Sequence, residues 1–267
     1  MTLTTYETDE SRTTMRDLEG MSVVITGGGT GIGAGTARHL VAGGARVTVC
    51  GRREDRVRAL ADELGERCAW VVADVTVASD RTRIIETAAA HGDGIEVLVN
   101  AAANMYRGDI DALDEARLLE TFHSNVVGAM MLTGEALPYL VASRGCVIFF
   151  GSVHIKRAFP GASPYAATKG ALEAATGVLA AELGPKGVRV SCIRPGGVFS
   201  ELNQRAGLFD DTAAKERLEA LGPAHALGRP GTPEEIAEGI EYLARAEWTT
   251  GSVLVVDGGL GLGTTNA

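Results

Sequence analysis

Tyr165 and Lys169 are the side chains in this sequence whose types and spacing could move a proton. They stand four residues apart in the run Ser163-Pro-Tyr-Ala-Ala-Thr-Lys169, so on a helix they would lie on one face, a turn apart. A phenol has a pKa of about 10, which makes it a poor acid or base near neutral pH. A fixed ammonium beside it favours the phenolate and lowers that pKa. The pair could pass a proton to or from a substrate oxygen, although the same spacing is common on solvated helix faces.

Ser152 is a second group that could serve the same reaction. It closes a β-type run, Phe149-Phe-Gly-Ser152, thirteen residues before Tyr165. At the carboxyl end of a parallel strand, a side chain faces the crevice where sheets of this kind bind ligands. A nucleophilic serine is not indicated, because the flanking residues do not form a Gly-x-Ser-x-Gly turn and no His–Asp support is evident.

A glycine-rich run near the start of the chain predicts a dinucleotide site. The first apolar run leads directly into Thr26-Gly-Gly-Gly-Thr-Gly-Ile-Gly33, and a helical stretch follows. Glycines permit a tight turn, and they let backbone N–H groups approach a pyrophosphate at the start of a helix. The position between a strand and a helix distinguishes this run from an ordinary turn.

Short β-branched runs alternate with longer helical stretches, and this alternation would position the site. We expect strands at 22–26, 46–50, 69–73, 96–99, 145–150, 188–193 and 253–256. Helices would fill the stretches 33–43, 53–64, 80–91 and 114–142. Because the apolar runs are continuous rather than alternating, we expect the strands to be covered on both faces. Repeated βα units indicate an α/β fold with one parallel sheet and right-handed crossovers.

No linker divides the chain, so residues 20–267 are predicted to form a single domain. Residues 1–19 are polar, charged and threonine-rich, and we expect them to form a flexible N-terminal extension. The stretch from about 196 to 231 breaks the βα regularity. We expect it to be a lid that closes over the substrate and excludes water.

Composition argues against several classes of partner. The 267 residues are 45% hydrophobic, enough for a sizeable core, and their net charge of -9 argues against a broad nucleic-acid or anionic-membrane surface. We find no secretory signal and no run of about 18 apolar residues, so no membrane span is expected. The cysteines lack metal-like spacing, which predicts free thiols in a reducing, cytoplasmic compartment: Cys50, Cys68, Cys146 and Cys192. Four histidines lack ligand-like spacing too, so no metal is predicted: His39, His91, His123 and His225.

The glycine spacing Gly27-x-x-x-Gly31-x-Gly33, taken with Tyr165 and Lys169, resembles the short-chain dehydrogenase/reductase family in its short single-domain branch. The resemblance covers about residues 20 to 262. Further motifs follow in the family's order: Asp74-Val75, Asn100, Asn125-Val-Val-Gly128, Pro195-Gly196 and Val256-Asp-Gly-Gly259. The resemblance implies a Rossmann-type doubly wound parallel sheet of about seven strands, in the order 3-2-1-4-5-6-7, with helices on both faces.

The resemblance also implies a role for each candidate residue. Ser152 would hydrogen-bond the substrate oxygen, and Tyr165 would donate the proton in ketone reduction or accept it in alcohol oxidation. Lys169 would lower the pKa of Tyr165 and hold the nicotinamide ribose. Asn125 would fix a helix kink and a water molecule that links Lys169 to solvent. The implied cofactor-binding positions are Gly27, Thr30, Gly31, Ile32, Gly33, Arg52, Arg53, Asp74, Val75, Asn100, Tyr165, Lys169, Pro195, Gly196, Val198 and Ser200.

Two short stretches depart from the family's pattern. The usual Asn-Asn-Ala-Gly reads Asn100-Ala-Ala-Ala103 here. Ala101 loses a side chain that normally supports the central sheet, and Ala103 replaces a glycine near the cofactor, so we expect slightly altered packing with function retained. Ser200 stands where the family often has threonine, and its hydroxyl can still bond the carboxamide.

The end of the second predicted strand bears on the choice of cofactor. An acidic residue there would accept hydrogen bonds from the ribose hydroxyls of NAD. The sequence instead reads Cys50-Gly-Arg-Arg-Glu54, so Gly51 takes that place and Arg52 follows. An arginine can pair with a 2′-phosphate through charge-assisted bonds, so NADP(H) is favoured over NAD(H). Two solvated arginines at the start of a helix are the alternative, and no basic residue lies inside the glycine loop.

The substrate pocket and the assembly are less defined. His154, two residues past Ser152, is a candidate for the pocket, although a lone histidine is as often a packing or surface residue. Core or lid packing explains the apolar candidates equally well: Met105, Tyr106, Phe199, Leu202 and Leu208. A stripe of small residues follows Tyr165, at Ala166, Gly170, Ala174 and Gly177. Family members commonly form tetramers through this helix and the long one before it, so a homotetramer is expected, although packing within the subunit explains part of the stripe.

These features favour an NADP(H)-dependent oxidoreductase that interconverts a ketone or aldehyde and a secondary alcohol by hydride transfer, with Tyr165 as general acid or base. An NAD-dependent alcohol dehydrogenase of the same fold is the nearest alternative. A non-catalytic dinucleotide-binding regulator could lose Ser152, Tyr165 or Lys169, and a lyase or dehalogenase would more often alter the glycine loop or the lysine. All of these are intact. The substrate stays open among sugar, steroid, fatty-acyl and small cyclic carbonyl compounds.

Overall fold

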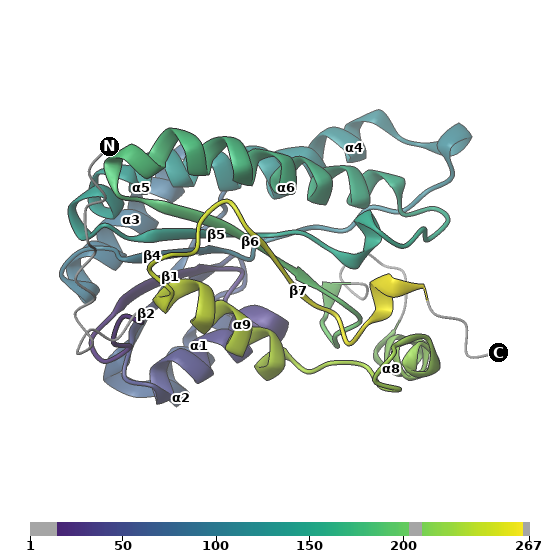
Figure 1. Cartoon of the computed structure of the whole chain (residues 1–267), viewed down its shortest axis with the longest axis horizontal. Helices are drawn as coiled ribbons and strands as arrows, with labels where there is room; N and C mark the ends of the chain where they lie inside the picture. Colours follow the sequence, from purple (N-terminus) through teal and green to yellow (C-terminus); the bar gives the residue numbers. More distant parts are fainter. Residues whose placement is uncertain (1–14, 203–209, 264–267) are drawn as a thin grey trace, which may run out of the picture.

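A single parallel sheet forms the centre of the computed structural model, which describes residues 15–202 and 210–263. Its seven strands lie in the order β3-β2-β1-β4-β5-β6-β7 (Figure 1). They are β1 (Ser22–Thr26), β2 (Arg46–Gly51), β3 (Cys68–Val72), β4 (Val97–Asn100), β5 (Cys146–Phe150), β6 (Arg189–Pro195) and β7 (Val253–Val256). The predicted fold class and strand order are confirmed, and each predicted strand lies within two residues of the observed one at either end.

Helices cover both faces of the sheet (Figure 1). On one face lie α1 (Gly31–Ala42), α2 (Glu54–Leu64) and α9 (Pro233–Arg245). On the other lie α3 (Ala78–Gly92), α5 (Gly128–Ser143) and α6 (Ser163–Leu183). α4 (Glu115–Phe122) precedes α5, and α8 (Asp211–Ala220) lies beyond the carboxyl end of β6. This two-sided cover explains why the strand segments are continuously apolar.

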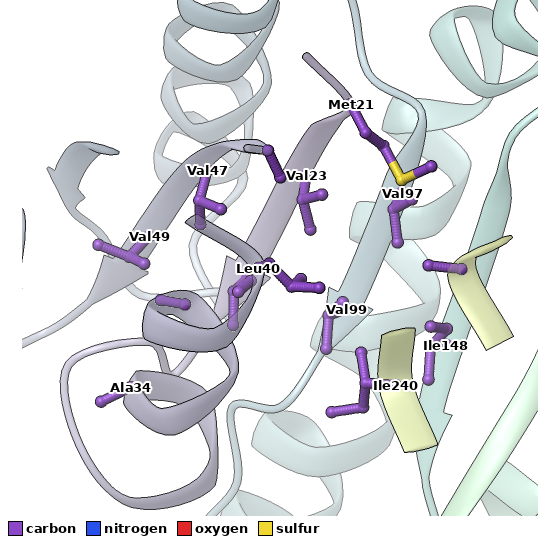
Figure 2. Close-up of a cluster of buried hydrophobic side chains, with 14 of the residues drawn as sticks. Met21, Val23, Ala34, Leu40, Val47, Val49, Val97, Val99, Ile148 and Ile240 are labelled. Carbon is purple, nitrogen blue, oxygen red and sulfur yellow. The ribbon is translucent and has the colours of Figure 1, made fainter. Parts of the chain in front are cut away.

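Two apolar clusters hold these layers together. Figure 2 shows the first, in which Leu40 of α1 and Ile240 of α9 pack with Val23, Val97 and other strand residues. The second cluster joins α3, α5 and α6 to the opposite face of the sheet. Every residue of β1, β4 and β5 is buried. All six strand pairs are parallel, so the segments that follow β1, β2, β4, β5 and β6 emerge at one edge of the sheet.

The described part of the predicted N-terminal extension packs against the domain. Met15 forms a β-bridge with Ala246, and the Arg16 guanidinium lies 3.1 Å from the Glu96 carboxylate. Leu18 is 6% exposed and belongs to the first apolar cluster. Residues 15–19 are therefore anchored rather than flexible, because their side chains supply core and ion-pair contacts. Residues 1–14 lie outside the described part of the chain.

The predicted lid contains regular structure. Within residues 196–231 lie α8 and a short helical turn, Gly222–Ala224. Leu208, a candidate for the substrate pocket, belongs to 203–209, which lie outside the described residues. A β-bridge between Val198 and Gly231 joins the two ends of this stretch.

One helical run, Glu115–Ser143, is long and apolar enough to cross a membrane by length and composition alone. Its most apolar window has a mean hydropathy of 1.4 and is 33% buried. Leu132, Ala136 and Leu140 from this run are fully buried in the second apolar cluster. Core helices pass the same test, so a single such run is weak evidence, and the expected absence of a membrane span stays a prediction.

Candidate active site

The carboxyl edge of the sheet opens into a pocket that gathers most of the predicted site residues. The proton-transfer candidates Ser152, Tyr165 and Lys169 all line it. The other predicted positions in its lining are Gly27, Thr30, Gly31, Ile32, Gly33, Arg52, Asp74, Val75, Met105, His154, Pro195, Gly196, Val198, Ser200 and Leu202. Groups predicted from motifs far apart in the chain therefore share one cavity.

Five predicted positions do not line this pocket. Asn100 and Asn125 are buried, with 3% and 1% of their surfaces exposed. Arg53 lies outside the pocket lining and donates a hydrogen bond to the lining residue Thr30. Tyr106 lines an adjoining hollow, and Phe199 is 42% exposed. The buried asparagines can act only through the residues that they hold.

Several lining residues were not predicted from the sequence. They are Cys50, Asn104, Ser124, Phe150, Glu201, Leu218 and Leu221, besides small residues of the loops. Leu218 and Leu221 come from α8 and its end, within the stretch 196–231, and the lid itself stays a prediction. The polar residues Asn104 and Ser124 bond each other at 3.1 Å between Nδ2 and Oγ, a contact that no spacing rule shows.

Two positions of the glycine loop have no room for a side chain. Gly27 has a φ of 65°, and a Cβ there would lie 2.8 Å from the Cα of Ala102. A Cβ on Gly33 would lie 2.4 Å from the Gly27 carbonyl oxygen. α1 begins at Gly31, and Thr30 before it makes no side-chain cap, so no side chain caps the first N–H groups of the helix. This cradle fits the pyrophosphate of a dinucleotide, which would accept bonds from those groups.

Asn125 lies in a wide turn that interrupts the predicted helix 114–142. The residues His123–Val127 form a π-helical turn between α4 and α5. Asn125 donates from Nδ2 to the Asn104 carbonyl at 2.8 Å and to Thr168 Oγ1 at 3.0 Å, and its Oδ1 accepts from the Asn104 N–H at 2.7 Å. The expected role of Asn125 in fixing a kink stays a prediction. Asn125 joins this turn to α6 and to the loop after β4.

The proton-transfer candidates come from β5 and α6. Ser152 follows β5 and caps a short helical turn, Val153–Ile155, while Tyr165 and Lys169 lie in the first two turns of α6. Their exposed fractions are 7% for Ser152, 7% for Tyr165 and 2% for Lys169. The Lys169 ammonium nitrogen lies 5.6 Å from the centroid of the Tyr165 ring. The spacing of four residues therefore gives the predicted shared face.

Burial governs the pKa of both groups. Burial raises the pKa of Tyr165 to about 12, and the hydrogen bond with Ser152 opposes this rise only in part. Burial lowers the pKa of Lys169 to about 8, while the Cys192 thiol acts in the opposite direction. The cost of burying a phenolate dominates the pKa of Tyr165, and the expectation that Lys169 lowers this pKa stays a prediction. Tyr165 is accordingly a neutral phenol at pH 7, the form that donates a proton.

His154 stands beside the two hydroxyl groups. Its Nδ1 lies 3.1 Å from Ser152 Oγ, and its ring packs against Phe159 at 4.4 Å and edge-on to Tyr165 at 5.4 Å between centroids. Burial, with a smaller contribution from the Arg107 charge, lowers the pKa of His154 to about 4. A neutral imidazole therefore lines the pocket next to the serine.

Arg52 and Arg53 follow β2 and bond residues of the same pocket. Arg52 donates to Asn104 Oδ1 at 3.3 Å and lies 3.7 Å from the Asp74 carboxylate. Arg53 donates to Thr30 Oγ1 at 3.2 Å. Gly51 leaves room beside them, because a Cβ there would meet only a methyl group of Val57, at 3.2 Å. The end of β2 thus presents positive charge where an acidic residue would suit NAD.

Comparisons with known proteins agree with this architecture. A family model described as enoyl-(acyl carrier protein) reductase matches residues 27–261. The chain is 39% identical to L-fucose dehydrogenase of Bos taurus over 251 residues, which is 91% of this chain and 90% of the relative. A solved structure named as a short chain dehydrogenase/reductase family protein is 33% identical, with a TM-score of 0.79, and covers 91% of this chain and 98% of its own. The chain belongs to the short-chain dehydrogenase/reductase family.

A further solved structure of this family carries a cofactor. It is 3-ketoacyl-(acyl-carrier-protein) reductase from Brucella melitensis complexed with NADH, 26% identical with a TM-score of 0.81, and the match covers 91% of this chain and 99% of that one. As a short-chain dehydrogenase/reductase with such relatives, the chain is an oxidoreductase that acts on CH–OH or C=O groups with NAD(P).

One of the two departures from the family's pattern lies at the end of β4 and in the loop that follows. Asn100 donates to Thr133 Oγ1 at 3.3 Å, and its Oδ1 has no hydrogen-bond partner among the described residues. Ala101 packs against the first apolar cluster. The Ala102 N–H donates to Thr26 Oγ1 at 3.0 Å, which ties this loop to the glycine loop. The expected loss of polar support at Ala101 is thus replaced by apolar contact in this short-chain dehydrogenase/reductase.

Lys169→Met is expected to raise the free energy of unfolding at pH 7. Burial lowers the pKa of Lys169 from 10.5 to about 8, so folding at neutral pH buries an unfavourable charge that methionine lacks. Between these two pKa values the unfolded chain binds more protons than the folded chain, so wild-type stability rises with pH across that window. The difference in the free energy of unfolding between Lys169→Met and the wild type, measured by thermal unfolding, should therefore become smaller from pH 7 to pH 10.

The exposed Lys186→Met serves as the control for loss of a lysine charge. This account of the buried ammonium would be contradicted if the wild type were more stable than Lys169→Met at pH 7. It would also be contradicted if the difference in the free energy of unfolding did not depend on pH.

Proposed function

We propose that this oxidoreductase prefers NADP(H) and interconverts a ketone or aldehyde and a secondary alcohol, with Tyr165 as the general acid or base. The observation that supports the proposal best is that Ser152, Tyr165 and Lys169 line one pocket together with the glycine loop. A regulator that only binds a dinucleotide would not need these three buried polar groups, whose burial is costly.

Hydride transfer is the chemistry that a bound nicotinamide supplies. Ser152 would donate a hydrogen bond to the carbonyl oxygen as negative charge develops there. Tyr165 would give its proton to the same oxygen, so that the carbonyl carbon gains the hydride and its oxygen the proton. Lys169 would stabilise the phenolate that remains. In alcohol oxidation the same groups act in reverse.

The preference for NADP(H) is supported by Arg52 and Arg53 at the end of β2. Two guanidinium groups suit a 2′-phosphate, and Gly51 offers no carboxylate to the ribose hydroxyls. NAD(H) is the second candidate, because a structural relative is complexed with NADH and the glycine loop itself contains no basic residue.

The substrate is proposed only as a small carbonyl or alcohol compound. The relatives named above act on different classes, a sugar in one case and a 3-ketoacyl group in the other. His154, Met105 and Leu202 line the pocket and would contact the substrate. A cytoplasmic location is also proposed, since all four cysteines are free and buried.

Tyr165→Phe is expected to lower kcat by at least about a hundredfold, because it removes the proton donor while leaving the ring in place. Binding of NADP+, measured by calorimetry, should persist. Tyr139→Phe, on the half-exposed face of α5, is the matched control and should keep full turnover. Substantial residual activity in Tyr165→Phe would refute the assigned role.

Arg52→Ala should raise the Kd for NADP+ about tenfold, the size expected for loss of one charge-assisted bond, and should change the Kd for NAD+ little. Arg46→Ala, at the exposed first residue of β2, controls for the loss of a positive charge. A clear preference for NAD(H) that Arg52→Ala does not affect would contradict the proposed preference for NADP(H).

The chain is proposed to form a homotetramer through α5 and α6. Their exposed apolar side chains include Met130, Met131 and Val178, which are 42%, 49% and 58% exposed. A Cβ on Gly170 or Gly177 would meet nothing within 4 Å, so another helix could approach closely there. Sedimentation velocity should show a tetramer, and Val178→Glu should shift it to smaller species. A monomeric wild type would contradict the proposal.

A further inference from the structure

A carboxylate from the segment after β6 lies against the arginines at the end of β2. Glu201 places Oε2 2.8 Å from Arg53 Nη1 and Oε1 4.0 Å from Arg56 Nη2. The Glu201 side chain is 28% exposed, against 39% for Arg53 and 52% for Arg56, so solvent only partly screens the pair. Both oxygens of one carboxylate thus face the guanidinium groups of two arginines.

The position of Glu201 is set by the backbone on its N-terminal side. Val198 pairs with Gly231, whose N–H donates to the Gly197 carbonyl at 2.9 Å. Ser200 packs on the glycine loop, since a Cβ on Gly31 would lie 3.1 Å from the Ser200 Cβ. Glu201 follows directly and lines the pocket. The ion pair therefore connects the stretch after β6 to Arg53, the residue that precedes α2.

Each candidate phosphate-binding arginine already has a carboxylate beside its positive charge. Arg52 lies 3.7 Å from Asp74, and Arg53 lies 2.8 Å from Glu201. A 2′-phosphate adjacent to Arg53 would bring up to two negative charges next to the Glu201 carboxylate. Like charges at such separations repel. The phosphate would therefore have to compete with Glu201 for the Arg53 guanidinium, whereas the ribose hydroxyls of NAD(H) carry no charge that could displace it.

We infer that Glu201 is a specificity-determining residue, whose carboxylate competes with the 2′-phosphate of NADP(H) for Arg53 and so narrows the difference in affinity between NADP(H) and NAD(H). The inference rests on the proposed role of the arginines at the end of β2. It makes the choice of cofactor depend on a residue far along the chain, not on β2 alone.

Glu201→Gln tests the inference by binding rather than turnover. Calorimetry with NADP+ and NAD+, and with adenosine 2′,5′-bisphosphate and adenosine 5′-monophosphate, isolates the contribution of the 2′-phosphate. Removing an ion pair of this exposure should tighten the two 2′-phosphorylated ligands about fivefold and leave the other two within about twofold. Glu201→Asp retains the charge and should stay nearer the wild type than Glu201→Gln does.

Two further variants sharpen the result. Glu219→Gln removes one negative charge from α8, where Glu219 lies 3.9 Å from Lys215, and should change none of the four affinities. Arg53→Gln should weaken only the 2′-phosphorylated ligands. Adding Glu201→Gln to Arg53→Gln should then give a smaller gain than it gives in the wild type, because the residue for which the two anions compete is gone.

The outcomes separate this inference from the proposed preference for NADP(H). If Glu201→Gln leaves NADP+ affinity unchanged, or tightens NAD+ equally, the role of Glu201 is overturned, whichever dinucleotide the wild type prefers. If the wild type prefers NAD+ while Glu201→Gln selectively tightens NADP+, the proposed preference fails and the role of Glu201 stands.

Discussion

The backbone of the glycine loop approaches the loop after β4 so closely that no side chain fits between them. Gly27 and Ala102 meet at this point, and the adjacent bond from the Ala102 N–H to Thr26 Oγ1 fixes it. The contact joins the segments that follow two neighbouring strands, β1 and β4. Both segments line the pocket, the first through the start of α1 and the second through the loop that contains Asn104.

The buried position of the proton-transfer groups opposes their ionisation. α6 places Tyr165 and Lys169 a turn apart with almost no solvent contact, and the same burial disfavours the charged form of each. A site that must pass a proton gains from a dry environment, in which electrostatic interactions with a reacting oxygen are strong. The opposed pKa shifts of the two residues are the physical consequence of that environment.

Much of the fold could be predicted from the sequence because its signals are local. Continuous apolar runs such as that of β5 indicate strands covered on both faces, and glycines between a strand and a helix indicate the cofactor loop. The resemblance predicted a helix kink at Asn125, but the apolar pattern continues through the π-helical turn and does not mark it. The rise in the pKa of Tyr165 was not predicted, because spacing shows a neighbour but not burial. The contact between Arg53 and Glu201 joins residues 148 positions apart (201 minus 53), and no periodicity connects them.

The π-helical turn between α4 and α5 restricts how this chain can change in length. A π turn contains one residue more than the α-helical turn that would replace it, and each residue of an α-helix advances about 100° around the axis. Deleting a single residue from His123–Val127 could leave an unbroken, locally favourable helix. Because a π turn and the α-helical turn that replaces it complete about the same rotation, Leu132, Ala136 and Leu140 would still face the sheet. A deletion within this segment would then preserve the packing of α5 but remove the wide turn that holds Asn125 against Asn104 and Thr168. A deletion in the regular helix that follows would instead rotate every later position by about 100°.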